Sequence, residues 1–269
     1  MDNKIKIPIR FFVVTFLWSW LFFGAAIFIE QGNCQSDAVS LMFLMGIFGP
    51  VIGALFSVRT IEGKGAIRKF LKSFLSLNFG WKVWLSIFLV LGSVSVLAWL
   101  LPELFGADRL PVNFPSLYLL PIFLLMMIFL SGGQEEVGWR GYISPYLEKR
   151  FGLVIGALIL GIVWAVWHLP LWFLSAAGLS HTNFFAFMLG VIGISYFFSW
   201  IVSASGNRLM SGLVAHGLLN ASTSFFPNVI MIDGATQERF WIYCILMFVV
   251  GIVVVMLRTY KKSVPLRFF

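Results

Sequence analysis

Long apolar runs without charge recur along this chain, and they limit its possible folds more than any other feature. A helix needs about 20 mostly apolar residues to cross a hydrocarbon layer about 30 Å thick. Because 60% of the 269 residues are hydrophobic, a water-soluble domain is excluded. We expect an all-α, polytopic membrane bundle that forms a single domain over residues 1–269. We count about eight transmembrane helices: Phe11–Ile29, Ala38–Val58, Val83–Leu101, Leu117–Leu130 with a continuation whose end the sequence does not define, Leu153–Leu174, Phe184–Ala204, Ser211–Phe226 and Phe240–Leu257.

The distribution of charge predicts how these spans are oriented. If the N-terminus is cytoplasmic, the inner segments hold 17 of the 19 basic residues, and the outer loops keep only Arg109 and Arg239. Six of the 11 acidic residues lie in the outer loops. This asymmetry follows the positive-inside rule for all eight spans, so we expect both termini to be cytoplasmic. We interpret the first span as a retained anchor, because its apolar run is too long for a signal peptide and no A-x-A site follows.

Composition also limits which partners the protein can bind and where in the cell it can lie. The net charge of +8 follows from the topology, so we expect the lipid bilayer as a partner and no nucleic acid. The two cysteines, Cys34 in an outer loop and Cys244 in the last span, are not expected to form a disulfide, and their spacing is not that of metal ligands. We predict a multi-pass protein of a bacterial plasma membrane.

A few polar residues lie within or beside the spans, where polarity is costly. Even insertion scales assign a charge at the bilayer centre about 2.5–3.5 kcal/mol, so such residues are functional candidates by default. In the motif "EEVGWR", Glu136 and Arg140 are i,i+4 neighbours in the favourable order for an ion pair. Glu135 points about 100° away from Glu136 and has no basic residue at i+3 or i+4. It must therefore be solvated, protonated or held for another role.

Two further motifs carry polar groups into apolar helices. "WAVWHLP" places Trp164 one turn before His168, and "HGLLN" places His216 and Asn220 on one helix face. Each motif alone also has a structural interpretation. The acidic pair can mark the end of a span, His168 can be a packing residue, and His216 with Asn220 can join neighbouring helices by hydrogen bonds.

The spacing of the first two motifs predicts a helical hairpin. Glu135 lies 15 residues before Arg150, and His168 lies 15 residues after Leu153. At 1.5 Å per residue, each is about 22 Å from a turn at residues 150–152, so antiparallel helices would bring them level. Pro145 and the pair Gly132–Gly133 oppose one continuous first helix.

Taken in order, the three motifs resemble those of the CPBP family of intramembrane proteases, which includes type II CAAX prenyl endopeptidases and the bacterial "Abi" proteins. The motif core spans about residues 131–221. One departure is Trp164, where the family more often has Phe, a change that preserves an aromatic wall. The resemblance implies that Glu135 and His168 activate a water and that His216 and Asn220 stabilise the oxyanion. It also implies that Glu136 and Arg140 form a supporting ion pair.

The chemistry of these residues suits peptide hydrolysis by water. The reaction needs a base for water, donors aimed at the developing oxyanion and a proton for the leaving amine. Because no serine or cysteine has an obvious base beside it, we favour direct attack by water over a covalent intermediate. The expected substrate is a membrane-associated peptide or protein, of a prenylated CAAX or bacteriocin-like type.

The residues leave metal use open. Glu135, His168 and His216 supply the ligands of a catalytic zinc site with water in the fourth position, and the family is often classed with metalloproteases. Against zinc, HExxH is absent and the same side chains serve as base and oxyanion donors. We favour a mechanism that requires no cofactor, with zinc as the alternative.

Two other classes of function fit the composition. The first is a non-enzymatic membrane protein, either a bacteriocin-immunity partner or a scaffold, in which the motifs join helices as polar contacts. The second is a small-solute transporter, which we disfavour because no pair of broken spans repeats in the two halves of the chain.

Overall fold

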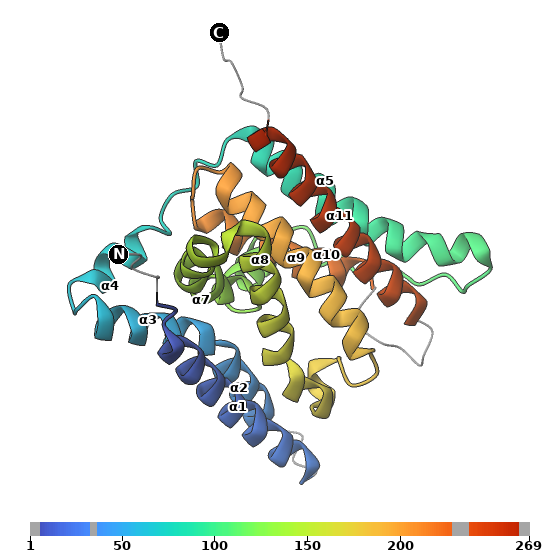
Figure 1. Cartoon of the computed structure of the whole chain (residues 1–269). Helices are drawn as coiled ribbons and strands as arrows, with labels where there is room; N and C mark the ends of the chain where they lie inside the picture. Colours follow the sequence, from blue (N-terminus) through green and yellow to red (C-terminus); the bar gives the residue numbers. More distant parts are fainter. Residues whose placement is uncertain (1–5, 33–36, 228–236, 264–269) are drawn as a thin grey trace.

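The computed structural model describes residues 6–32, 37–227 and 237–263, and every regular element in those ranges is helical. Figure 1 shows the chain as a bundle of helices that cross at varied angles. The elements are α1 (Ile9–Gln31), α2 (Asp37–Ile47), α3 (Gly49–Ile61), α4 (Ala66–Lys72), α5 (Trp81–Leu100), η1 (Leu101–Phe105), α6 (Leu120–Phe129), η2 (Gly133–Glu135), α7 (Glu136–Gly138), η3 (Trp139–Ile143), α8 (Ser144–Trp167), η4 (Leu169–Phe173), η5 (Ser175–Ala177), α9 (Phe184–Ala204), α10 (Met210–Phe225) and α11 (Gln237–Ser263).

Several of these helices are long and apolar enough to cross a membrane. The described residues contain five such stretches, and α2 with α3, bent by 41°, can add a sixth. The predicted all-helical, multi-pass class is confirmed, whereas the count of eight spans is not. The predicted spans Leu117–Leu130 and Leu153–Leu174 both overlap one interrupted helical stretch, Leu120–Phe173. The predicted span Ser211–Phe226 forms α10, whose 16 residues are fewer than a straight crossing needs.

The segment α7–η3–α8 lies in the middle of the bundle. In Figure 1, α1, α2 and α3 lie on one side of it and α5 with α11 on the other. α9 packs against both α8 and α11, while α10 packs against α6 and α9. On the inner side of α3, a Cβ at Gly138 would collide with the backbone of Pro50, so this glycine allows α7 to lie directly against α3.

The predicted hairpin is present within α8. Gly152 has φ 78° and ψ 164°, which breaks the helix into two parts. Gly156 then packs against the backbone of Leu147 and Glu148, as expected where the chain reverses. Pro145 does not interrupt the hairpin, because it lies in the first turn of α8, where its missing N–H costs no hydrogen bond.

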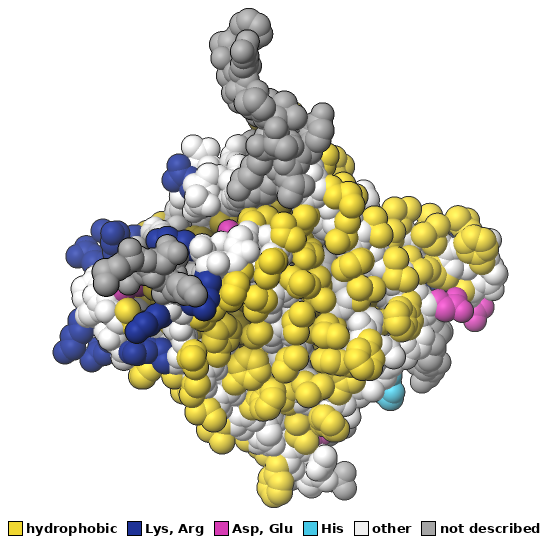
Figure 2. Space-filling model, viewed as in Figure 1, with side chains coloured by type: hydrophobic (Ala, Val, Ile, Leu, Met, Phe, Trp, Pro, Cys, Tyr) yellow, Lys and Arg dark blue, Asp and Glu magenta, His cyan; other side chains and the backbone are white. Residues whose placement is uncertain are grey.

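Charge is segregated on the surface. Figure 2 shows lysine and arginine side chains gathered over the α3–α4 end, acidic side chains at the opposite end and a broad apolar face between them. Such a face suits contact with lipid. Arg239, predicted to lie in an outer loop, is instead 1% exposed at the start of α11. Its Nε donates to the carbonyl of Trp99 at 3.0 Å, and Nη2 donates to the carbonyl of Asp108 at 2.8 Å.

Candidate active site

The carboxylate of Glu135 lies in the interior and is held by two indoles. Its residue is 4% exposed and ends the short helix η2. Oε2 accepts hydrogen bonds from Nε1 of Trp164 at 2.9 Å and from Nε1 of Trp139 at 3.3 Å. Trp139 stands at i+4 from Glu135, but as a neutral donor it was not predicted as a partner of the carboxylate. The bond from Trp164, 29 residues away, joins the first motif to the second.

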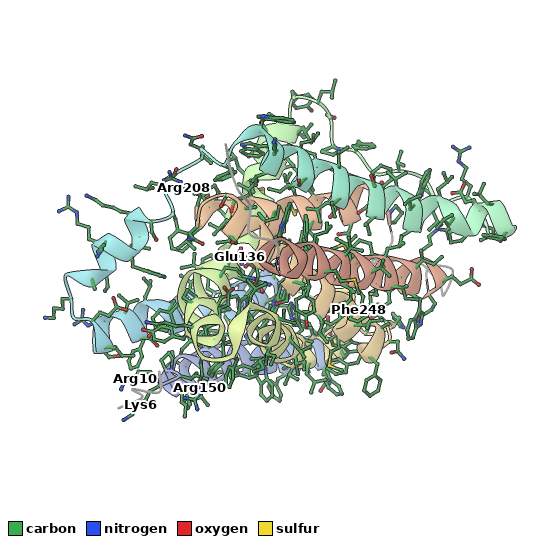
Figure 3. The ribbon with its side chains drawn as sticks, turned by 45° about the horizontal axis from the view of Figure 1, so that its top comes forward. Lys6, Arg10, Glu136, Arg150, Arg208 and Phe248 are labelled. Carbon is green, nitrogen blue, oxygen red and sulfur yellow. The ribbon has the colours of Figure 1, made fainter. Side chains whose placement is uncertain are left out.

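The predicted ion pair between Glu136 and Arg140 is confirmed. Both oxygens of Glu136 lie 3.1 Å from Nη1 of Arg140, and the two residues are 0% and 2% exposed. In Figure 3, Glu136 lies among the crossing helices, whereas the labelled Lys6, Arg10 and Arg150 lie toward one edge. A buried ion pair is costly to desolvate and needs further hydrogen bonds to be stable.

Glu136 also receives a hydrogen bond that the sequence did not predict. Nδ1 of His216 on α10 lies 2.9 Å from Oε1 of Glu136, although the two residues are 80 positions apart. This contact joins the first motif to the third. Because the carboxylate oxygen accepts, Nδ1 is the donor and the Nε2 atom of His216 remains for another partner.

The Trp164 ring forms an aromatic wall against the side chains of Arg140 and His216. The Arg140 guanidinium lies 4.8 Å from the Trp164 ring centroid, and the ring of His216 lies 5.2 Å away in an edge-on contact. Phe198 on α9 extends the wall, 5.3 Å from the same guanidinium and 5.6 Å from His216. Phe198 was not predicted as a site residue, because it lies in a run of apolar residues and no sequence signal separates it from core positions.

His168 reaches this group through Trp164. Its Nδ1 lies 2.9 Å from the carbonyl oxygen of Trp164, and the two rings are 5.9 Å apart. Its ring also contacts Trp167 at 4.6 Å and Phe187 at 5.1 Å. Since a carbonyl only accepts, Nδ1 carries the proton and Nε2 is the free nitrogen of a neutral ring. Among the hydrogen bonds of the described residues, none joins His168 directly to Glu135 or His216.

Asn220 and His216 meet the chain at a glycine that precedes the first motif. Nδ2 of Asn220 donates to the carbonyl of Ser131 at 2.6 Å. Gly132 has φ 117°, and a Cβ there would collide with Asn220 Nδ2 and His216 Nε2. Only glycine allows both this backbone conformation and this close approach. The pair Gly132–Gly133 was predicted only to break a helix, although a glycine pair directly before two acids is also a signal for such a close contact.

The predicted site residues thus come from three segments and converge. Glu135 and Trp164 are hydrogen bonded, Glu136 binds both Arg140 and His216, and Asn220 lies beside His216 at Gly132. His168 packs against the Trp164 wall. One region of the interior therefore holds a carboxylate that can act as a base, two imidazoles and an amide donor.

The possible zinc ligands were tested against this geometry. Over the described ranges, no three His, Cys, Asp or Glu side chains are placed to hold one ion. His216 Nδ1 and Glu135 Oε2 are engaged in hydrogen bonds with Glu136 and the two indoles. Oε1 of Glu135 and Nε2 of both histidines are not used in these hydrogen bonds, but these three side chains are not placed as one group of metal ligands. Cys34 lies outside the described residues, and Cys244 is buried with a free thiol.

Two comparisons with known proteins bear on this site. Residues 117–222 match the family model described as "Type II CAAX prenyl endopeptidase Rce1-like". The chain is also 23% identical to CAAX prenyl protease 2 of Methanococcus maripaludis over 225 residues, which cover 79% of this chain and 82% of that relative. These two matches support a protease of the CPBP family.

The matched region of this CPBP protease contains all three motifs. It begins before α6 and ends within α10, so it includes the first acidic motif, the hairpin and the His216–Asn220 face. The protease is therefore an intramembrane endopeptidase that acts on peptides in a membrane setting.

Proposed function

We propose that this CPBP protease cleaves membrane-associated proteins that end in a prenylated CAAX sequence, using a water molecule activated by Glu135 and His168. The names of its matching family and relative refer to CAAX prenyl proteases. In a CAAX protein the lipid is attached to a cysteine three residues before the C-terminus. The broad apolar surface of the protease suits a substrate held at the membrane by such a lipid.

In this proposal Glu135 is the general base. Both indoles donate to its Oε2, so Oε1 is the oxygen available to a water molecule. A proton passes from water to Glu135 while the water oxygen attacks the scissile carbonyl carbon. The same proton is then delivered to the leaving amine as the C–N bond breaks. This sequence needs no covalent intermediate and restores the carboxylate.

His168 orients the attacking water. Its Nδ1 is held by the carbonyl of Trp164, which fixes the ring and leaves Nε2 to accept a hydrogen bond. The surrounding rings of Trp167 and Phe187 further restrict its rotation. A fixed acceptor of this kind lowers the entropic cost of placing the water.

His216 and Asn220 stabilise the oxyanion. One N–H of the Asn220 amide binds the Ser131 carbonyl, which leaves its second N–H to donate. When His216 is protonated on both nitrogens, Nδ1 donates to Glu136 and Nε2 donates to the developing negative charge. Arg140 balances the charge of Glu136, so positive and negative charges within the buried group offset each other.

The observation that supports this function best is the convergence of the three motifs. Trp164 binds Glu135 at 2.9 Å and His216 binds Glu136 at 2.9 Å, across 29 and 80 residues of chain. Helix packing alone does not require polar groups from three segments to meet within an apolar protein.

The substitution Glu135→Gln tests the proposal. It keeps the size of the side chain and its acceptor for the indoles but removes the base, so cleavage should fall at least about a hundredfold. The purified variant is assayed with a farnesylated CAAX peptide in lipid nanodiscs, and its unfolding midpoint is recorded. Glu62→Gln, at the exposed end of α3, is the matched control and should retain full activity. Full activity of a folded Glu135→Gln protein would remove Glu135 from the mechanism.

A further inference from the structure

Gln134 is a buried polar residue that the proposed mechanism does not use. It stands in the middle of η2, directly before the two acids, and is 4% exposed. Nε2 of its amide has no hydrogen-bond partner among the described residues, although the atom is buried. Because a buried donor without an acceptor is costly, an apolar side chain of similar size would serve stability better at this position. The amide is therefore better explained by what its oxygen binds.

The oxygen of this amide binds the backbone of Gly132. Oε1 accepts a hydrogen bond from the Gly132 N–H at 2.9 Å, which links residues only two positions apart. The Gly132 carbonyl in turn accepts a hydrogen bond from the N–H of Glu135 at 2.9 Å. Both backbone polar groups of Gly132 are thus bonded while the residue keeps its φ of 117°. The Gln134 side chain supplies one of these two bonds.

The N–H that Gln134 binds belongs to the same peptide group as the Ser131 carbonyl. That carbonyl accepts a hydrogen bond from Nδ2 of Asn220 at 2.6 Å. A trans peptide group is planar, and its N–H and C=O point in opposite directions, so fixing one fixes the other. Gln134 and Asn220 therefore bind opposite sides of one rigid group. If this peptide group rotated, Asn220 would lose its acceptor.

The side chain of Asn220 lies at the border between the packed interior and a cavity. Asn220 is half-buried and lines a cavity of about 110 Å³ between α9, α10 and α11. Phe187, whose ring contacts the His168 ring at 5.1 Å, lines the same cavity. The amide that the Ser131–Gly132 peptide holds is thus accessible from a space that also borders the environment of His168.

We propose that Gln134 is a positioning residue for oxyanion stabilisation, because it sets the orientation of the Asn220 amide through the Ser131–Gly132 peptide. The inference rests on the proposed function, in which Asn220 is an oxyanion donor. Gln134 itself does not touch the substrate. An oxyanion develops only as the transition state forms, so a misaligned Asn220 amide lowers kcat and leaves substrate binding in the ground state largely unchanged.

The substitution Gln134→Met tests the inference, since methionine keeps the length of the side chain but has no oxygen to bind Gly132. For cleavage of a farnesylated CAAX peptide in nanodiscs, kcat should fall at least about tenfold, while KM changes less than about twofold. Gln134→Leu should give the same result and replaces Gln134→Met if that protein does not fold. Gln31→Met, at the exposed end of α1, is the matched control and should keep both constants.

A double-mutant cycle with Asn220→Ala shows whether Gln134 acts through Asn220. Asn220→Ala alone should lower kcat about a hundred- to a thousandfold. In that background Gln134→Met should lower kcat by less than about a further twofold, because the amide that Gln134 positions is gone. An equal loss of kcat in both backgrounds would show that Gln134 acts on Glu135 or on folding. That result, or an unchanged kcat for Gln134→Met alone, would overturn the inference.

An experimental structure of the Gln134→Met protein separates this inference from the proposed function. The Ser131–Gly132 peptide should be rotated and the Asn220–Ser131 hydrogen bond broken, whether or not a CAAX peptide is cleaved. If the wild type cleaves no CAAX peptide but the bond is broken in the variant, the proposed function fails and the positioning by Gln134 stands. An Asn220 amide that keeps its bond to Ser131 in the variant overturns the inference even when the protease is active.

Discussion

Gly132 shows how a residue without a side chain can shape a site. Its φ of 117° belongs to glycine, and the space where a Cβ would stand is taken by Asn220 and His216. Its neighbour Ser131 supplies the carbonyl that holds the Asn220 amide. The backbone here therefore fixes both proposed oxyanion donors.

We predict that Gly132→Ala abolishes cleavage. The new methyl group displaces Asn220 and His216, and loss of one oxyanion donor alone costs about a hundred- to a thousandfold in kcat. Gly178→Ala is the matched control, because Gly178 also has positive φ (70°) but nothing lies within 4 Å of its Cβ position. Rates and unfolding midpoints of the two proteins are compared. Equal activity of the two variants would show that Gly132 is a turn residue and no more.

The placement of the possible metal ligands leads to a prediction about metals. We propose that catalysis requires no bound ion, since no three His, Cys, Asp or Glu side chains in the described part of the chain are placed to hold one. Activity should therefore survive prolonged treatment with 1,10-phenanthroline. Loss of activity that added zinc restores would establish the zinc mechanism instead.

At the scale of helices, glycine contacts set how closely α9 and α11 approach. A Cβ at Gly193 would collide with the backbone of Met247 and Phe248, and Gly251 faces Gly193 in return. Small residues that let two helix backbones touch are a common basis of association in membranes. Figure 3 places Phe248 on α11, away from Glu136, so this contact is separate from the site.

Gly193→Ala should therefore destabilise the protein by about 1–3 kcal/mol through overpacking. Gly24→Ala on α1 is the control, because nothing lies within 4 Å of its Cβ position and alanine favours a helix by up to about 1 kcal/mol. Unfolding midpoints in detergent measure both. A Gly193→Ala protein as stable as the Gly24→Ala protein would mean that α9 and α11 can separate without cost.

The sequence predicted the parts of these elements that depend on local signals. Glu135 and His168 are equally far along the chain from the turn at Gly152, which predicted the hairpin. The i,i+4 order of Glu136 and Arg140 predicted their ion pair. The Glu136–His216 bond and the place of Phe198 in the wall depend on how distant helices pack, which one sequence does not record. The indole donors were missed for a chemical reason, since only charged partners were considered for Glu135.

At the scale of the whole molecule, charge is separated between two ends, a feature that predicts orientation in a membrane. Basic side chains gather over the α3–α4 end and acidic ones at the opposite end (Figure 2). We propose that the basic end and both termini face the cytoplasm of a bacterial-type cell. The number of crossings was harder to predict, because α6 is short and the stretch Leu120–Phe173 is interrupted rather than straight.

Cysteine labelling tests this orientation. In a Cys34→Ser background, Lys64→Cys lies between α3 and α4 and Arg109→Cys lies after η1. A membrane-impermeant maleimide applied to intact cells should label the Arg109→Cys protein and spare Lys64→Cys until the cells are lysed. Cys244 is buried and should stay unlabelled in both. The reverse pattern would invert the proposed topology.

The π-helical turn η3 lies between Glu136 and Ser144. A wider turn of this kind accommodates an additional residue and so rotates whatever follows it about the axis. The chain after η3 forms α8, which carries Trp164, while the chain before it supplies Glu135 and Glu136. A change in the number of residues in this turn would therefore rotate α8 and alter how the Trp164 indole meets Glu135.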